Sequence, residues 1–420
     1  QHGLPRPATT TQRTEEELKE EQLQIQEYRD LEDLIKTKIA ERQYTVEVLQ
    51  LTSKLLKKNP EYYTIWNVRR RLLIHGFFSK SSDSSSPSKE LSSISTTATT
   101  KASSTDSSSS PSNTTAAATT IPHDPASRNH GKNGTTLDLI RADLEFLFPI
   151  MILYPKCYWV WNYRLWLLQQ ANERLDPDIA RELWNGELKL VSKMLVKDSR
   201  NFHGWGYRSK VVSELESAAL HGKSMTEAEF EYTTKMITSP KGLSNFSAFH
   251  RRGKLIPNFW MKEGQMIRQD GCSWKKVEFD MIFSAMYTDS YPYAQSAWFY
   301  YQFLMTTLTD PVGHATVTPN LTAEERVTFV IRQLADLKEM LDGAEDNKWI
   351  YNALIEYTLV LSQMAERQPR PDEKQDCMLW LTELRKLDPL RNGRWDDLEL
   401  FLEGPYPPLG LVPEIHNPCL

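Results

Sequence analysis

Residues 60–69 read PEYYTIWNVR, so that a tryptophan follows a proline after five intervening residues and an arginine follows after two more. Four further stretches are similar: 155–164 (PKCYWVWNYR), 199–208 (SRNFHGWGYR), 243–252 (LSNFSAFHRR) and 292–301 (PYAQSAWFYY). In each of these ten-residue stretches the seventh position is aromatic. Recurrence of one phrase along a chain indicates a repeat architecture, in which every copy forms the same small structural unit.

The seventh positions of the five stretches are nearly evenly spaced. They are Trp66, Trp161, Trp205, Phe249 and Trp298. The two central steps are 44 residues long and the last is 49, whereas the first is 95 and contains a Ser- and Thr-rich stretch. Removing about 51 residues there would restore the period. A period of 44 exceeds the tetratricopeptide unit but lies in the range of HEAT and armadillo repeats, so the period by itself leaves the repeat family open.

Helical patterns separated by short turns fill most of the chain, and no stretch shows the sustained alternation of a β-strand. Apolar residues recur at helical spacing from Thr14 to about Arg42 and again from Val46 to Lys58, where Asn59-Pro60 ends the pattern. One helix pair cannot bury its apolar face alone, so successive pairs must stack. The sequence therefore predicts an all-α fold, a right-handed α-α superhelix in which antiparallel helix pairs build a crescent-shaped solenoid.

Composition separates the helical parts from polar segments. Ser, Thr, Ala and Pro dominate from about Ser79 to Thr136. Such a segment buries too little apolar surface to offset the entropy of ordering it, so we expect a disordered insertion in a loop. The predicted organisation is a flexible N-terminal arm (1–13), the first helices with the first repeat (14–78), the disordered insertion (79–136), the remaining helical repeats (137–403) and an extended Pro-rich tail (404–420).

Charge, cysteine usage and hydropathy indicate a soluble protein. The formal net charge of −5 does not favour binding to nucleic acid. No apolar run is long enough to span a bilayer, so no transmembrane segment is expected. The four cysteines are widely spaced and form no CxxC pair, which is typical of reduced thiols, and we therefore expect a cytoplasmic protein.

The aromatic residue and the arginine of each stretch are predicted to serve packing between repeats. The ring lies one turn into the second helix of a pair and is expected to fill the seam between neighbouring pairs. The arginine, three positions later, lies on the same helix face. Because a partly buried guanidinium must be paired, we expect carboxylates or helix-end carbonyls beside Arg69, Arg164, Arg208 and Arg252.

The tandem Pro-x5-Trp-x2-Arg phrase resembles the repeat of protein prenyltransferase α subunits, and the resemblance runs from about residue 45 to about residue 402 apart from the insertion. Within that family the chain is most similar to the Rab geranylgeranyltransferase (type II) α subunits of fungi, which lack the immunoglobulin-like and leucine-rich domains of animal members. This closer likeness is carried by the start His2-Gly3 and by 295–300 (QSAWFY), 346–349 (DNKW), 388–391 (DPLR) and 396–398 (DDL). Family members pair with a β subunit that forms an α-α barrel.

The resemblance implies a subunit of a prenyl-transferring enzyme. The implied reaction moves a geranylgeranyl group from geranylgeranyl diphosphate to C-terminal cysteines of Rab GTPases, which a Rab escort protein presents. Zinc is expected in the β subunit, and no metal site is expected here because the chain has no Cys/His/Asp cluster at ligand spacing. Two alternatives stay open: the α subunit of farnesyltransferase or type I geranylgeranyltransferase acting on CaaX proteins, and a non-catalytic helical-repeat scaffold.

The resemblance also implies site residues. Turns that precede the repeated tryptophans reach the active site in the family, and a lysine five residues before the third-repeat tryptophan contacts the diphosphate. Arg200 occupies that position, so it is the implied catalytic residue, stabilising charge on the leaving diphosphate; a solvated turn arginine is the alternative. The implied substrate-binding residues are Tyr158, Asn201, Phe202, His203 and Asn245. Packing or capping is the competing interpretation for Asn201 and Asn245, and a structural role is the alternative for His203.

Two more histidines, and two departures from the phrase, bear on the site. His250 follows the fourth-repeat aromatic residue, where a structural role is the alternative. His2 lies on the predicted arm, and its imidazole could reach the partner's zinc ion and compete with substrate. Phe249 replaces the repeated tryptophan and Tyr301 replaces the repeated arginine, which indicates altered packing in the fourth and fifth repeats.

Overall fold

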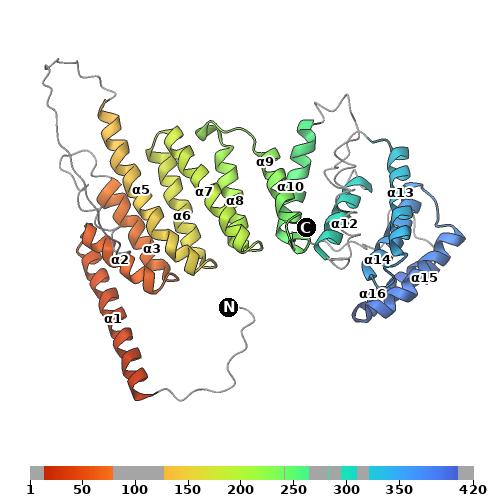
Figure 1. Cartoon of the computed structure of the whole chain (residues 1–420), viewed down its shortest axis with the longest axis horizontal. Helices are drawn as coiled ribbons and strands as arrows, with labels where there is room; N and C mark the ends of the chain where they lie inside the picture. Colours follow the sequence, from red (N-terminus) through yellow and green to blue (C-terminus); the bar gives the residue numbers. More distant parts are fainter. Residues whose placement is uncertain are drawn as a thin grey trace, which may run out of the picture. The chain divides into compact units, whose positions relative to one another are not determined.

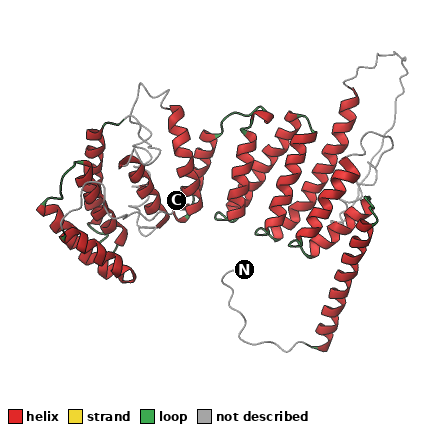
Figure 2. Cartoon of the chain, turned by 180° about the vertical axis from the view of Figure 1, so that it is seen from behind, coloured by secondary structure: helices red, strands yellow, loops and turns green. Residues whose placement is uncertain are grey.

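Helices make up all of the regular structure in the described part of this chain (Figures 1 and 2). The predicted all-α class, a solenoid of successive helix pairs, is therefore confirmed. The structure is a computed structural model, and it describes residues 14–78, 127–240, 242–263, 282, 295–309 and 321–404, without the side chains of 127–134 and 257–263.

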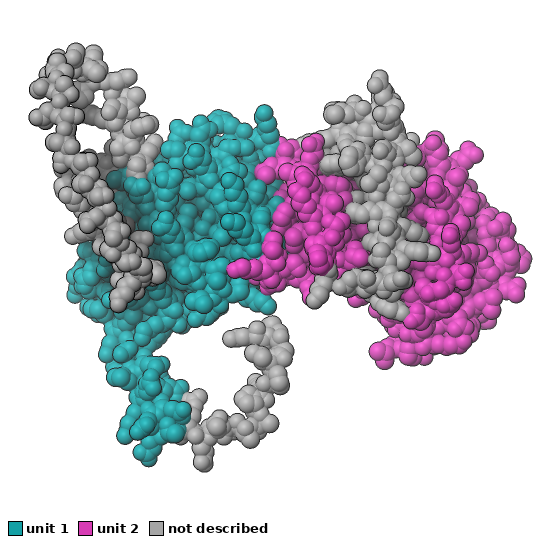
Figure 3. Space-filling view, in the orientation of Figure 1, with its two compact units in different colours: residues 1–194, 203–223 teal, residues 195–202, 224–420 magenta. Residues whose placement is uncertain are grey.

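The chain divides into two compact units, which Figure 3 shows in different colours. Unit 1 comprises residues 1–194 and 203–223, and unit 2 comprises residues 195–202 and 224–420. Each unit contains its own stacked helices and its own buried core, so each is considered by itself below.

Unit 1 carries the first repeats, and each repeated phrase follows the turn between two helices. Helix α2 packs against α3, and α5 packs against α6. The elements that lie wholly or mostly in unit 1 are α1 (Glu15–Ala40), α2 (Val46–Lys58), α3 (Tyr63–Leu72), the π-helical turn η1 (Leu73–Phe78), α5 (Ser127–Leu153), α6 (Tyr158–Arg174), α7 (Pro177–Lys197), α8 (Phe202–Leu215) and the 3-10 turn η3 (Ala218–Leu220).

The first two helices begin and end for the reasons that the sequence suggests. At the start of α1 the hydroxyl oxygen of Thr14 accepts from the Glu17 backbone N–H at 3.2 Å, and the Glu17 carboxylate accepts from the Thr14 backbone N–H at 2.9 Å. This capping box satisfies two backbone donors that the helix leaves open. Helix α2 stops before Asn59, because Pro60 has no N–H to continue the helix.

The spacing between proline and tryptophan has a structural cause. The indole Nε1 of Trp66 donates to the carbonyl oxygen of Pro60 at 2.8 Å, and Nε1 of Trp161 donates to that of Pro155 at 2.9 Å. Each ring therefore folds back over its turn and satisfies a carbonyl that lies outside the helix. The five intervening residues correspond to the reach of one indole across the turn.

The first two repeated arginines pair with carboxylates from the following helix pair. The Nε of Arg69 donates to the two carboxylate oxygens of Asp143 at 2.9 and 3.1 Å. Arg164 binds Glu187 with two parallel hydrogen bonds, from Nε to Oε2 at 2.5 Å and from Nη2 to Oε1 at 2.6 Å. Arg69 also donates to the carbonyl of Leu49 at 3.0 Å, so one guanidinium joins its own helix pair to the next. The predicted carboxylate and carbonyl partners are confirmed for both arginines.

A tyrosine of the following repeat completes each of these two clusters. The hydroxyl of Tyr163 donates to Asp143 at 2.6 Å, and the hydroxyl of Tyr207 donates to Glu187 at 2.6 Å. The centroids of the two tyrosine rings lie 4.9 and 5.1 Å from the tryptophan ring of the preceding repeat. The tryptophans therefore fill the seams between neighbouring pairs, as predicted, and each seam contains an aromatic contact beside a buried ion pair.

The other two repeated arginines are also buried and hydrogen-bonded. Arg208 Nη1 donates to the hydroxyl of Ser192 on α7 at 2.7 Å. Arg252 Nη1 donates to the carbonyl of Phe230 at 3.0 Å and to the hydroxyl of Thr234 at 2.8 Å. The carbonyl partner of Arg252 therefore lies within α9 and not at a helix end as predicted, and for Arg208 the structure adds a serine hydroxyl that the sequence did not predict.

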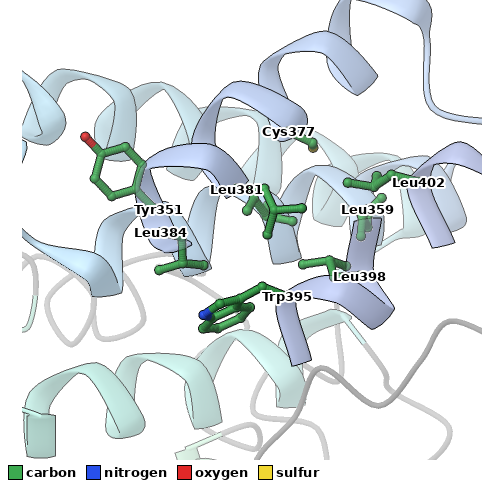
Figure 4. Packing of buried hydrophobic residues seen from close by; sticks show 9 residues of the cluster. Tyr351, Leu359, Cys377, Leu381, Leu384, Trp395, Leu398 and Leu402 are labelled. Carbon is green, nitrogen blue, oxygen red and sulfur yellow. The ribbon is translucent and has the colours of Figure 1, made fainter. Parts of the chain in front are cut away.

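Unit 2 is built from further packed helices with a separate core. Helix α14 packs against both α13 and α15. Leu381 of α15 and Trp395 of α16 belong to a buried cluster that also includes Leu359 of α14 (Figure 4). The elements of unit 2 are α9 (Thr226–Ile237), η4 (Gly242–Ser244), α10 (Phe246–Glu263), α12 (Gln295–Thr309), α13 (Ala323–Leu341), α14 (Lys348–Met364), α15 (Pro371–Leu387), η5 (Pro389–Arg391) and α16 (Asn392–Glu403).

The two departures from the repeated phrase keep a packed seam by other means. Phe249 is fully buried, and its ring centroid lies 5.1 Å from that of Tyr300. Tyr301, in place of arginine, donates its hydroxyl to Gln333 Oε1 at 3.0 Å. Burial raises the pKa of the Tyr301 phenol well above its ordinary value, so this seam has a neutral hydrogen bond.

Parts of the predicted organisation lie outside the described residues. They are the arm (1–13), most of the insertion (79–126), the tail after 404 and, apart from residue 282, a helix that the apolar pattern predicts over 279–287. Helix α5 begins at Ser127, within the range assigned to the insertion. Residues 127–136 (SRNHGKNGTT) are polar, so apolar periodicity gives no sign of a helix there.

Replacing Asp143 by asparagine tests the buried clusters of unit 1. Asp143→Asn keeps the side-chain shape but removes the counter-charge of the buried Arg69 guanidinium, so the free energy of unfolding should fall by about 3–5 kcal/mol. Urea unfolding followed by circular dichroism measures it. The control is Asp376→Asn, because Asp376 pairs with Lys338 at the surface and an exposed pair contributes less than about 1 kcal/mol. Equal losses for the two variants would contradict a special contribution of the buried Arg69–Asp143 pair to stability.

A second prediction concerns acid stability in unit 2. Hydrogen bonds from Arg367, at 2.7 and 2.8 Å, are the main reason why the pKa of Glu373 falls from 4.5 to about 2. Because the folded-state pKa is depressed, this carboxylate stabilises the fold fully above about pH 4.5, and the contribution is lost as the pH falls toward about 2. In Glu373→Gln the urea concentration at the unfolding midpoint should therefore change less between pH 4.5 and about pH 2 than it does in the wild type. An unchanged slope would disprove the linkage.

Candidate functional site

In the turn before a repeated aromatic residue, neighbouring side chains differ in exposure: the one four positions before the ring is buried in the second, third and fourth repeats, and the one three positions before it is exposed. The residue three positions before the repeated ring is exposed in four repeats: Tyr63 (54%), Tyr158 (53%), Phe202 (83%) and Phe246 (36%). The repeated rings themselves are buried. Rings of this size exposed at the same place in successive repeats are typical of a surface that contacts another molecule.

In unit 1 these outward rings form a continuous series, which we name the aromatic ladder: Tyr63, Trp159, Tyr158 and His203. The ring centroids of Tyr63 and Trp159 are 5.3 Å apart, and those of Trp159 and Tyr158 are 5.2 Å apart in an edge-to-face arrangement. Tyr158 and His203 follow at 6.3 Å. The ladder therefore brings together two predicted site residues, Tyr158 and His203, from successive repeats.

Further apolar side chains are exposed at the end of α5 in unit 1. Leu153 and Tyr154, at the end of α5, are 72% and 42% exposed. Removing such side chains from water favours association at about 25 cal/mol per Å² of apolar area. The turns thus present rings and aliphatic groups suited to a protein partner.

Cations occupy a fixed position in two of the turns. Arg200, the predicted catalytic residue, is exposed five positions before Trp205. Lys156 is exposed at the equivalent position, five before Trp161 and two before Tyr158. The sequence prediction did not include Lys156, although aligning the second and third phrases places it in register with Arg200. Both cations are accessible to an anionic ligand.

The position four before the repeated ring points inward instead. Cys157, Asn201 and Asn245 occupy it, and all three are buried. The Oδ1 of Asn245 accepts from the Ala248 backbone N–H at 3.2 Å, which caps α10, while its Nδ2 has no hydrogen-bond partner. Burial favours the packing and capping interpretation of Asn201 and Asn245, so direct contact of these amides with substrate stays a prediction.

The remaining predicted residues differ in accessibility. Phe202 is largely exposed at the start of α8, where it offers an apolar surface without a hydroxyl. His203 is half-buried on the aromatic ladder. His250 is half-buried, with its ring centroid 6.1 Å from that of Phe246. Burial, and then the charge of Lys254, lowers the pKa of His250, so its imidazole is neutral over a wider pH range than usual.

Metal and membrane features were also sought in the described ranges. Among these residues no group of three or more His, Cys, Asp or Glu side chains lies where it could hold a metal ion, so this part of the chain does not fit a zinc site. Within the same ranges no helix combines the length and the apolar character that crossing a bilayer would require.

The repeated helix pairs match a known family model. The model described as "Protein prenyltransferase alpha subunit repeat" matches residues 46–76, 140–171 and 184–215. The first range contains α2 and α3, and the others contain the corresponding helices of the next two repeats. The unit that the model describes is therefore the helix pair with its turn, which is the part of the fold that presents the site.

Relatives with similar sequences extend over almost the whole chain. Proteins named "Geranylgeranyl transferase type-2 subunit alpha" from Saccharomyces cerevisiae and Schizosaccharomyces pombe are each 28% identical to it, over 94% and 95% of this chain and 97% of each relative. The protein of the same name from Rattus norvegicus is 26% identical over 72% of this chain but only 41% of its own length. The predicted likeness to the fungal form is confirmed by these extents.

A solved structure shares the fold. A chain of "Candida albicans protein geranylgeranyltransferase-I complexed with GGPP" matches with a TM-score of 0.51 over 96% of this chain and 95% of its own length, at 16% identity. At this identity the likeness concerns the fold alone. The chain therefore contains repeats of the protein prenyltransferase alpha subunit type, and it is similar over almost its whole length to type-2 alpha subunits.

Proposed function

We propose that this chain is the α subunit of a heterodimeric protein geranylgeranyltransferase of type II. The enzyme transfers a geranylgeranyl group from its diphosphate to cysteine thiols. The observation that carries the proposal is the match to type-2 α subunits over nearly the full length of the chain and of the fungal relatives. The exposed turns support it, because those of unit 1 offer an apolar surface for docking, and the exposed Lys156 and Arg200 each offer a cation.

The first task of the chain in this proposal is to bind the β subunit. The aromatic ladder, together with Leu153 and Tyr154, forms the docking surface. The buried clusters, such as Arg69 with Asp143, hold successive helix pairs in register. A rigid spacing of the turns lets several of them meet one partner surface without ordering costs on binding.

The second task is to stabilise negative charge. Breaking the bond between the prenyl carbon and the diphosphate oxygen leaves a diphosphate, whose growing charge needs positive donors. Arg200 and Lys156 present a cation at the same position of successive turns. A guanidinium offers two parallel donors to phosphate oxygens, whereas an ammonium acts as a point charge. These two residues are the proposed diphosphate contacts of this chain.

The remaining components of the reaction belong to other molecules in this proposal. The zinc ion, which would lower the pKa of the acceptor thiol, is held by the β subunit. The acceptor is a Rab GTPase presented by a Rab escort protein, and the enzyme acts in the cytoplasm. Tyr158 and His203 of unit 1 would border the site where prenyl group and acceptor meet. Phe202 is separately proposed to contact substrate.

Co-expression with a type-II β subunit tests the assignment. We expect a stable heterodimer that transfers labelled geranylgeranyl to a Rab–escort complex and leaves a CaaX peptide unmodified. Transfer to the CaaX peptide without an escort protein would instead support the α subunit of farnesyltransferase or of type I geranylgeranyltransferase. Failure to form a heterodimer with either kind of β subunit would support a scaffold role and overturn the proposal.

Removing the turn cations tests the diphosphate contact. Lys156→Met and Arg200→Met should each raise the KM for geranylgeranyl diphosphate by about tenfold or more, since a hydrogen bond to a charged group contributes roughly 1.5–3 kcal/mol. The matched control is Lys210→Met, because Lys210 is exposed on α8 but lies several residues beyond the turn. If the control raised KM as much as the other two, general charge rather than these positions would be responsible.

A further inference from the structure

Two adjacent arginines on α3 are held in different ways. Arg69 is neutralised by Asp143. Arg70 is half-buried, and its Nη2 donates to the side-chain oxygen of Asn162 on α6 at 3.1 Å. Its guanidinium carbon lies 5.5 Å from the centroid of the Trp166 ring, and its Nε is buried without a hydrogen-bond partner. Among the described residues no carboxylate pairs with Arg70, so its positive charge is not cancelled locally.

The amide of Asn162 links this charge to the aromatic ladder. Its Nδ2 donates to the hydroxyl oxygen of Tyr158, one helical turn earlier on α6, at 3.1 Å. The orientation of the amide follows from the donors around it. A guanidinium has only donors, so the single acceptor of the amide must face Arg70, and the NH2 group must face Tyr158.

The direction of the Tyr158 proton follows in turn. The phenol oxygen already accepts a hydrogen bond from Asn162, so its own proton cannot lie along that line and must point elsewhere. The edge-to-face contact with Trp159 holds the ring, and 53% of the residue is exposed. Tyr158 therefore presents its proton to solvent as a hydrogen-bond donor. A donor backed by a cation suits an anionic oxygen.

We propose that Arg70 and Asn162 are positioning residues, which orient the Tyr158 hydroxyl as a donor to a phosphate oxygen of the prenyl diphosphate. This inference rests on the proposed function, and it deepens the role of the same site. Arg70 fixes the orientation of the Asn162 amide, and Asn162 fixes the direction of the Tyr158 hydroxyl proton. Of these three residues only Tyr158 touches the ligand. Lys156, two residues before Tyr158, brings a full charge to the same turn.

The variant that isolates this role is Asn162→Asp. Aspartate has almost the shape of asparagine and forms an ion pair with Arg70, but it can only accept, so the phenol proton turns inward. In the assembled heterodimer the Kd for geranylgeranyl diphosphate should rise about tenfold, as for Tyr158→Phe, since each loses one hydrogen bond to a charged group. Urea unfolding should show no loss of stability. A purely structural role predicts unchanged affinity for Asn162→Asp.

The double variant and a charge control complete the test. Because Asn162 acts through Tyr158, Tyr158→Phe combined with Asn162→Asp should bind as weakly as Tyr158→Phe alone; additive losses would overturn the proposal. Asn67→Asp places the same new charge beside Arg70, whose Nη1 donates to Asn67 at 3.4 Å, but it does not contact Tyr158. An equal loss for this control would assign the effect to charge and reject the positioning role.

The wild-type heterodimer separates this inference from the proposed function. If it does not bind geranylgeranyl diphosphate at all, the function assigned above fails. If it binds the ligand but Asn162→Asp leaves the Kd unchanged, the function stands and the positioning role of Asn162 fails.

Discussion

Each buried guanidinium of the repeat needs partners, and for Arg69 and Arg164 the following helix pair supplies a carboxylate. An unpaired charge inside a protein is costly, so Arg69 can be buried only where Asp143 is present. Asp143 in turn accepts from Tyr163, a residue of the following repeat. Glu187 does the same for Arg164, 44 residues further along the chain. The ion pairs therefore specify the register in which helix pairs stack, while the aromatic seams supply most of the apolar contact.

The same turn that directs one ring into the seam directs another ring outward. Because Trp161 bonds back to Pro155, the start of α6 is held at a defined angle, and Tyr158 must lie on the outside. Functional side chains at these turns are thus positioned by the packing of the repeat itself. The buried clusters fix the spacing of the turns, so a partner that contacts several turns at once must match that spacing. A structural repeat can therefore also serve as a recognition surface.

The repeated phrase was sufficient to predict the helix pairs, the buried rings and the pairing of the arginines, because each of these depends on local spacing. It could not identify Asp143 or Glu187, since acidic residues are common on helices and only the stacking of pairs selects these two. The prediction missed Lys156, although its register matches Arg200, because the family resemblance assigns the diphosphate contact to the third repeat alone. The bond between Asn162 and Tyr158 spans four residues of one helix, but its polarity depends on Arg70 from another repeat.

Comparison of the repeats shows why the second is suited to a directed hydroxyl. The third repeat has Phe202 and Gly206 where the second has a tyrosine and an asparagine, so it offers neither phenol nor amide. The first repeat does have Tyr63 and Asn67, but in the described structure no hydrogen bond joins them, and Arg70 approaches Asn67 only to 3.4 Å. A tyrosine and an asparagine at the right spacing are therefore insufficient. The preceding repeat must also contribute a cation that does not pair with a carboxylate. Arg70 meets that condition because Asp143 pairs with Arg69, the residue beside it.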